Sequence, residues 1–253
     1  MTLRLFGCVC GQFHGSAEGM GMAGTGPVSV PVPFYVLEHP DGVALFDCGL
    51  PAGMVDYDDS YRQALRATDI DASLTPEETA TRHLERLDID PARVRQVVVS
   101  HLHFDHVGGL REFPNAEVVI QRREWEAGFD RETAGHYGLR KRFFDLGHAV
   151  RLVDGEHDLF GDGSAVCLPS YGHTPGHQSL RVRSAQGDHI LVADACYNCR
   201  VAETRSFPDY SDAEAMNRSL DALLALREAA TVMVYGHDPD QWGERPVLPA
   251  ARS

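Results

Sequence analysis

Short apolar runs alternate with turn-forming residues along most of the chain, a pattern typical of buried strands. The runs that predict strands are residues 28–37, 42–46, 97–100, 116–120, 165–168, 179–182, 190–193 and 231–235. Pro31 and Pro33 interrupt the first run, and because proline cannot donate to a ladder we expect that strand at a sheet edge or beside a bulge. The Pro-Asp-Gly sequence at residues 40–42 predicts a hairpin into the second run.

Helical spacing is clear in two segments. Thr75, Pro76 and Glu78 have the residue types of an N-cap, a first helical position and a capping-box glutamate. A second helix is predicted over residues 211–228, with Ser211 as its N-cap. The apolar positions at helical spacing are Ala80, Leu84 and Leu87 in the first segment and Met216, Leu220, Leu223 and Leu224 in the second. We interpret both stripes as core packing.

The order of these elements predicts the fold class. Strands outnumber helices, and helices fall between strand runs in both halves, so we expect an α/β (α+β) fold with a two-layer sheet core and helices outside it. The glycine-rich residues 15–26 have predicted structure on both sides and are interpreted as a surface loop. With no linker in its 253 residues, the chain is expected to form a single domain, residues 1–253.

Composition excludes several classes of protein. Asp and Glu number 37 against 23 Lys and Arg, and a net charge of −14 disfavours nucleic acid as a partner. No apolar run reaches the roughly 18–20 residues that span a bilayer, so no membrane association is expected. Residues 1–10 lack the apolar stretch of a signal peptide, which indicates the cytoplasm. Six cysteines are too few for a disulfide scaffold and are expected to be thiols.

Histidines cluster after one predicted strand. Residues 101–106 read His-Leu-His-Phe-Asp-His, and alternation in an extended segment puts His101 and His103 on one side, before a helix expected to start near Val107. Imidazole and carboxylate ligands suit zinc, iron, cobalt or manganese. The alternative is an exposed, pH-sensitive histidine patch, which is disfavoured because crowded imidazoles suppress one another's protonation.

Three further polar residues follow apolar strands in the same way: His173, Asp194 and His237. Taken singly, Asp194 could be a helix cap and His237 an exposed loop residue, because polar residues commonly end strands. Their recurrence in a chain that also carries the residue 101–106 cluster favours a metal site.

The segments HLHFDHVGG (101–109), GHTPGHQSL (172–180), DACY (194–197) and YGHD (235–238) resemble the metallo-β-lactamase superfamily, and within it the N-acyl-homoserine lactonases. The resemblance implies an αββα sandwich that holds two divalent ions, zinc above all, with iron, cobalt or manganese as alternatives. It assigns His101, His103 and His173 to one ion and Asp105, His106 and His237 to the other. Asp194 would bridge the two.

The resemblance also implies an activity: hydrolysis of the lactone ring of N-acyl-homoserine lactones, which is quorum quenching. Two cations about 3.5–4 Å apart lower the pKa of a shared water, and the resulting hydroxide would attack the ester carbonyl. Tyr197 would hydrogen-bond the oxyanion. The ordinary alternative is a half-buried aromatic residue that packs structurally and exposes its hydroxyl to solvent. Asp105 would also pass a proton to the leaving oxygen, and His177 is expected to support the site without binding metal.

Two features depart from those lactonases. Cys196 stands where they commonly have serine, and with Cys199 it imitates a redox C-x-x-C, an interpretation disfavoured because no helix start or thioredoxin-like pattern is evident. Residues 13–34 and 50–73 match least, which leaves acyl-chain preference and the role of these cysteines open. The partner is expected to be a small lactone or ester, and the chain a monomer or homodimer.

Other functions remain as alternatives. A glyoxalase-II-like thioester hydrolase would use similar ligands, but that group carries a C-terminal helical region, and only 59 residues (253 − 194) follow Asp194. Hydrolysis of another lactone or ester is left open by the residues. A β-lactamase is disfavoured because such sites usually lack the bridging aspartate. A di-iron redox protein or a non-catalytic metal-binding module is the alternative of a different class.

Overall fold

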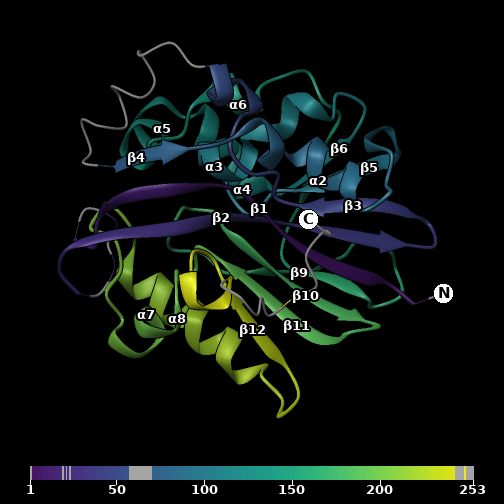
Figure 1. Ribbon diagram of the computed structural model, residues 1–253. Coiled ribbons are helices and arrows are strands. Elements are labelled where there is room, and N and C mark those ends of the chain that lie inside the picture. Colours follow the sequence, from purple (N-terminus) through teal and green to yellow (C-terminus); the bar gives the residue numbers. More distant parts are fainter. Residues whose placement is uncertain are drawn as a thin grey trace.

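The computed structural model describes residues 2–18, 20, 22, 24–56, 70–242 and 248, and its strands form two sheets (Figure 1). The larger sheet has seven strands in the order β4-β1-β2-β3-β5-β6-β7. Their bounds are β1 (Arg4–Ser16), β2 (Pro27–His39), β3 (Gly42–Phe46), β4 (Ile70–Ser73), β5 (Val94–Val98), β6 (Glu117–Gln121) and β7 (Val150–Val153). Neighbouring strands pair antiparallel in the β4-β1-β2-β3 part of the sheet and parallel in the β3-β5-β6-β7 part.

The smaller sheet has five strands in the order β12-β11-β10-β9-β8. Their bounds are β8 (His157–Asp158), β9 (Ala165–Pro169), β10 (Gln178–Ser184), β11 (Gly187–Ala193) and β12 (Val232–Tyr235). Only β11 and β12 pair in parallel.

Helices cover the outer face of each sheet (Figure 1). On the larger sheet lie α2 (Ala80–Arg86), α3 (Phe104–Val107), α4 (Arg122–Phe129), α5 (Arg131–Tyr137) and α6 (Lys141–Phe144), and on the smaller sheet α7 (Cys199–Thr204) and α8 (Ala213–Ala225). Short 3-10 turns are η1 (Ala52–Asp56), η2 (Pro76–Glu78), η3 (Pro91–Arg93), η4 (Gly108–Glu112) and η5 (Pro239–Gln241). Among the described residues, no helix is both long and apolar enough to cross a membrane.

Three buried apolar clusters correspond to the three interfaces between these layers. One lies between the sheets and includes Phe46 and Leu180, one joins the larger sheet to its helices through Leu84 and Phe144, and one joins the smaller sheet to α8 through Leu220. Burial of these surfaces is the main force that stacks the layers. The αββα sandwich implied by the sequence is confirmed.

Every predicted strand overlaps an observed one, with ends shifted by at most three residues. Of the two alternatives given for the prolines, the bulge is confirmed, whereas β2 is an inner strand of the sheet. β3 pairs with Tyr35–His39 of β2 and does not extend to Pro31 and Pro33. On the other side, the register of β1 shifts between Val9 and Gln12, opposite these prolines.

Three helix boundaries were predicted wrongly. Thr75 and Glu78 do form a capping box, but on η2, because Thr79 is extended (ψ 155°) and α2 starts only at Ala80. Asp212, not Ser211, caps α8: its carboxylate accepts from the backbone N–H of Ala215 at 2.9 Å, and the helix ends at Ala225. The helix expected near Val107 starts at Phe104, with His103 as its N-cap.

Candidate metal centre

The seven predicted ligands meet where strands of both sheets end. His101 and His103 follow β5, His173 follows β9, and Asp194 and His237 follow β11 and β12. The one-turn helix α3 adds Asp105 and His106. The side chains form two groups, each with its ligand atoms within 4.8 Å of one another. The first group consists of His101, His103, His173 and Asp194, and the second of Asp105, His106 and His237.

In the first group, three ring nitrogens crowd together. His101 Nε2 lies 2.9 Å from His103 Nδ1, and His173 Nε2 lies 3.2 Å and 3.0 Å from those two atoms. His103 Nε2 donates to the carbonyl of Tyr137 at 2.7 Å, which leaves a lone pair on Nδ1. Burial lowers the pKa of all three imidazoles, so they are neutral at pH 7 and able to bind a cation.

In the second group, two ring nitrogens face carboxylates. His237 Nδ1 donates to the carbonyl of Pro31 at 2.7 Å, and His106 Nδ1 donates to Asp47 Oδ2 at 2.8 Å. The opposite nitrogens of both rings point at Asp105: its Oδ2 lies 3.1 Å from His106 Nε2 and 3.6 Å from His237 Nε2. Both ring nitrogens therefore face anionic oxygens, and the nearby carboxylates raise the pKa of both imidazoles.

Asp194 lies between the two groups. Its Oδ2 is 3.8 Å from His101 Nε2 and 3.2 Å from His173 Nε2, in the first group. Its Oδ1 is 3.4 Å from His106 Nε2 and 3.2 Å from His237 Nε2, in the second. One carboxylate oxygen is thus directed at each group, which is the arrangement that a bridging ligand requires.

The donor set fits divalent cations. Among the described residues, His106 Nε2 and Asp194 Oδ1 are buried polar atoms with no hydrogen-bond partner, and such atoms are costly unless an ion satisfies them. Lone pairs that converge at 2.9–3.2 Å repel one another unless a cation lies between them. The absence of cysteine from both groups favours nitrogen and oxygen coordination.

Asp47 supports both groups and was missed by the sequence analysis. Its Oδ1 accepts from the Ser100 N–H at 2.7 Å and its Oδ2 from the Ser100 hydroxyl at 2.8 Å, in addition to the His106 ring. Because the Ser100 proton goes to Asp47, Ser100 Oγ accepts from His101 Nδ1 at 2.9 Å, and His101 Nε2 keeps a lone pair. Asp47 follows β3 as the ligands follow their strands, and this was the available signal.

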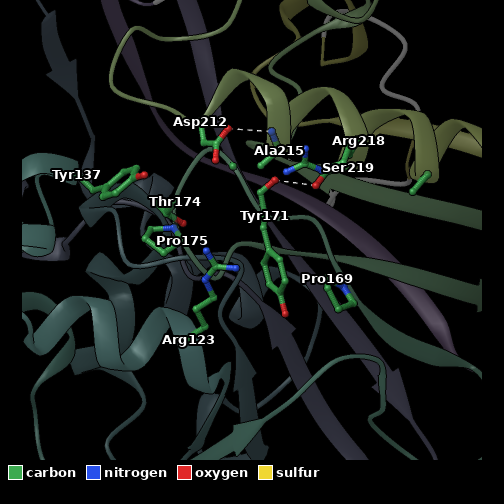
Figure 2. Close-up of a pocket in the computed structure, with 12 residues that line it drawn as sticks. Arg123, Tyr137, Pro169, Tyr171, Thr174, Pro175, Asp212, Ala215, Arg218 and Ser219 are labelled. Atoms are coloured by element: carbon green, nitrogen blue, oxygen red, sulfur yellow. Dashed lines mark hydrogen bonds between the residues drawn. The ribbon is translucent and has the colours of Figure 1, made fainter.

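The loop that carries His173 is held from two sides. Gly172 has φ 133°, and its carbonyl accepts from the Asp212 N–H at 2.9 Å. Gly176 donates its N–H to Glu124 Oε2 at 2.8 Å, and the other oxygen of this buried carboxylate accepts from Leu102 N–H. Beside the loop lies a groove of about 330 Å³. Two of the residues that line it, Ser219 and Tyr171, are joined by a hydrogen bond from the Ser219 hydroxyl to the Tyr171 carbonyl (Figure 2).

His177 belongs to the support of the site, as predicted. Its Nδ1 bonds to Ser170, and its Nε2 accepts from the Asp194 N–H at 3.1 Å, so both nitrogens are used. Burial lowers its pKa to about 3, which keeps the ring neutral and able to accept that bond.

Tyr197 lies over both groups. Its ring centroid is 5.7 Å from that of His173 and 5.6 Å from that of His237. Its hydroxyl lies 3.3 Å from the hydroxyl of Tyr210, a residue that the sequence analysis did not identify. Burial raises the Tyr197 pKa well above 10, so the phenol remains a hydrogen-bond donor at neutral pH.

The Cys196–Cys199 pair has no sign of redox chemistry, although one reason given against it was wrong. A helix, α7, does start at Cys199, with Asn198 as its N-cap. Both cysteines are free thiols, and burial raises the Cys196 pKa to about 12. A thiol with so high a pKa is a poor nucleophile.

Comparison with known proteins identifies the family. Residues 29–237 match the model of the metallo-beta-lactamase superfamily. The chain belongs to this superfamily. Two curated members are similar over most of their length: N-acyl homoserine lactonase AttM of Azorhizobium caulinodans, 33% identical over 235 residues, and AiiA of Bacillus thuringiensis subsp. kurstaki, 28% identical over 216 residues. The alignments cover 84% and 85% of this chain and 84% of each relative.

Solved structures of superfamily members agree over nearly the whole chain. An N-acyl homoserine lactone hydrolase with N-hexanoyl-L-homoserine bound at its catalytic metal centre superposes with a TM-score of 0.83 at 27% identity. A variant of B. thuringiensis AiiA with N-decanoyl-L-homoserine at its active site has the same TM-score at 26% identity. Each comparison covers 98% of both chains.

Proposed function

We propose that this protein is a metal-dependent hydrolase that opens the lactone ring of N-acyl homoserine lactones. Hydrolysis of these small-molecule substrates would be quorum quenching. Relatives of that activity share 33–35% identity with it over 84% of the chain. The observation that carries the proposal is Asp194, whose two oxygens face two separate groups of imidazole and carboxylate ligands.

Two cations would occupy these groups. His101, His103 and His173 would hold one cation, Asp105, His106 and His237 the other, and Asp194 would contact both. When bound, such a pair supplies a water of lowered pKa and a Lewis acid for the ester carbonyl. We propose zinc because five imidazoles and two carboxylates suit it, with iron, cobalt and manganese as alternatives.

The chain's own residues would orient the substrate and move the proton. The Tyr197 hydroxyl would donate to the carbonyl oxygen as charge develops on it, a role supported by the packing of its ring on His173 and His237. Asp105 would take up the proton that the attacking water loses and pass it from Oδ2 to the departing ring oxygen. Six free thiols suit a reducing cytoplasm, and a small buried site needs no second chain, so we propose a cytoplasmic monomer or homodimer.

The test is turnover by protein stripped of metal and reloaded with zinc. We expect hydrolysis of N-hexanoyl or N-decanoyl homoserine lactone, measured by the protons that the reaction releases. Elemental analysis should give two zinc ions per chain. His103→Ala should lose zinc and activity, whereas His148→Ala, whose ring hydrogen-bonds to the Phe113 carbonyl and belongs to neither ligand group, should keep both. Absence of turnover across short and long acyl chains, with thioester or simple ester hydrolysis instead, would contradict the proposal.

A further inference from the structure

Tyr210 lies beside the site without being a candidate ligand. It belongs to the segment between α7 and α8, and its ring centroid lies 5.9 Å from that of His103 and 5.6 Å from that of His173, both edge to face. It therefore covers the first ligand group, while Tyr197 lies over the junction with the second group.

Contacts other than the hydroxyl hold Tyr210 in place. Its backbone carbonyl accepts from His136 Nε2 at 2.9 Å, and its ring also packs edge to face on Tyr137 at 6.3 Å. The next residue, Ser211, donates its N–H to the carbonyl of Pro208 at 3.0 Å. The ring would keep its position without the hydroxyl, whose hydrogen-bond partner among the described residues is the Tyr197 hydroxyl.

Two phenols in contact have two protons, and only one can lie between their oxygens. Phenols titrate at about pH 10, so both protons are present at neutral pH. If Tyr210 donates, the Tyr197 proton is left free to donate to another acceptor. A phenol that accepts one hydrogen bond also becomes a better donor of another.

We propose that Tyr210 is a positioning residue: its hydroxyl donates to Tyr197 and directs the Tyr197 proton toward the carbonyl oxygen of the substrate. This inference rests on the proposed lactone hydrolysis. At 3.3 Å the bond is long for two hydroxyls, so its removal should cost at the modest end of hydrogen-bond energies, about three- to tenfold in rate.

The experiment compares zinc-loaded Tyr210→Phe, Tyr197→Phe and the double variant on N-hexanoyl homoserine lactone. Tyr210→Phe should lower kcat about three- to tenfold with KM and zinc content unchanged, because the interaction acts in the transition state. In the Tyr197→Phe background the same substitution should have no further effect. Tyr171→Phe is the matched control, since Tyr171 lies on the His173 loop and its ring packs on Arg123 in the groove of Figure 2.

Either of two results would overturn the inference: a Tyr210→Phe variant as active as the parent, or effects of the two substitutions that multiply independently. A packing role alone predicts that Tyr210→Phe is silent and only Tyr210→Ala is impaired. A crystal structure of zinc-loaded Tyr210→Phe gives a readout apart from activity. Tyr197 should be turned or in two conformers there, and an unmoved Tyr197 contradicts the pairing. If the parent protein opens no lactone, the proposed function is wrong, and this crystal comparison still decides the pairing.

Discussion

Asp47 determines the orientation of two imidazoles at the residue scale, because it binds His106 directly and His101 through Ser100. We expect Asp47→Asn to weaken zinc binding about 10- to 100-fold, the usual effect of losing a carboxylate that orients a ligand. Competition with a chromophoric chelator measures this. Asp41→Asn, an exposed carboxylate near His39 only, should leave zinc affinity unchanged. Equal affinities in the two variants would contradict the role given to Asp47.

The seven candidate ligands could be predicted because each follows an apolar run and belongs to a residue type that binds metal. Asp47 follows β3 in the same way, but one aspartate before Cys48 and Gly49 repeats no ligand pattern. Tyr210 could not be found at all: it lies in a polar segment whose return to His103 is decided by contacts with α5 and Tyr197. Local sequence does not encode such contacts.

At the scale of elements, close packing joins the His173 loop to α4. A methyl group on Gly176 would overlap the backbone nitrogen of Glu124. Gly176→Ala should therefore lower the free energy of unfolding by about 2 kcal/mol, as overpacking does. Gly135→Ala in α5 has nothing within 4 Å of its added methyl group and should raise that free energy by about 0.5–1 kcal/mol. Urea denaturation measures both, and a shift of the same sign in both variants would refute this packing argument.

A second prediction concerns α2 and β1. His83 Nε2 donates to the Val9 carbonyl at 2.8 Å, and its Nδ1 is buried with no hydrogen-bond partner among the described residues. Burial lowers the His83 pKa below 6.5, so the unfolded chain binds a proton that the folded protein does not. This histidine's contribution to stability is present above pH 6.5 and is lost as the pH falls below it.

Urea unfolding at pH 7.5 and pH 5.5 tests this contribution. His83→Gln can still donate to Val9 but does not titrate, so it should lose less stability on acidification than the parent protein. Parallel losses in the two proteins would show that His83 titrates normally in the fold.

All eight apolar runs that predicted strands overlap observed strands, because buried strands need continuous apolar residues. The apolar pattern did not predict β1, whose alternation is interrupted by Gly7 and Gly11 and whose pairing with β2 spans a bulge. It also missed β4 and β7, with four residues each, and β8, with two, which are too short to leave a clear pattern. The boundary between η2 and α2 was missed because the extended conformation of Thr79 is set by packing, while its sequence favours a continuous helix.

At the scale of the whole molecule, the candidate ligands come from both sheets, so bound cations would tie the two layers together. Zinc at about 100 times its dissociation constant should stabilise the fold by about 2.7 kcal/mol, which corresponds to about 5–10 °C in Tm. Differential scanning calorimetry with and without chelator measures the shift. His103→Ala should show a smaller shift and His148→Ala the full one. A Tm that is independent of zinc would exclude a metal site shared by the sheets.

The Pro31–His237 hydrogen bond joins residues 206 positions apart and has a consequence for biosynthesis. While the ribosome is still translating the region between His101 and His237, the nascent polypeptide exposes part of the ligand set without its remaining members. A cation captured then would bind only weakly and exchange quickly. Assembly of a metal centre from these residues would therefore follow translation, and the supply of metal to the finished protein would decide how much of it holds its cations.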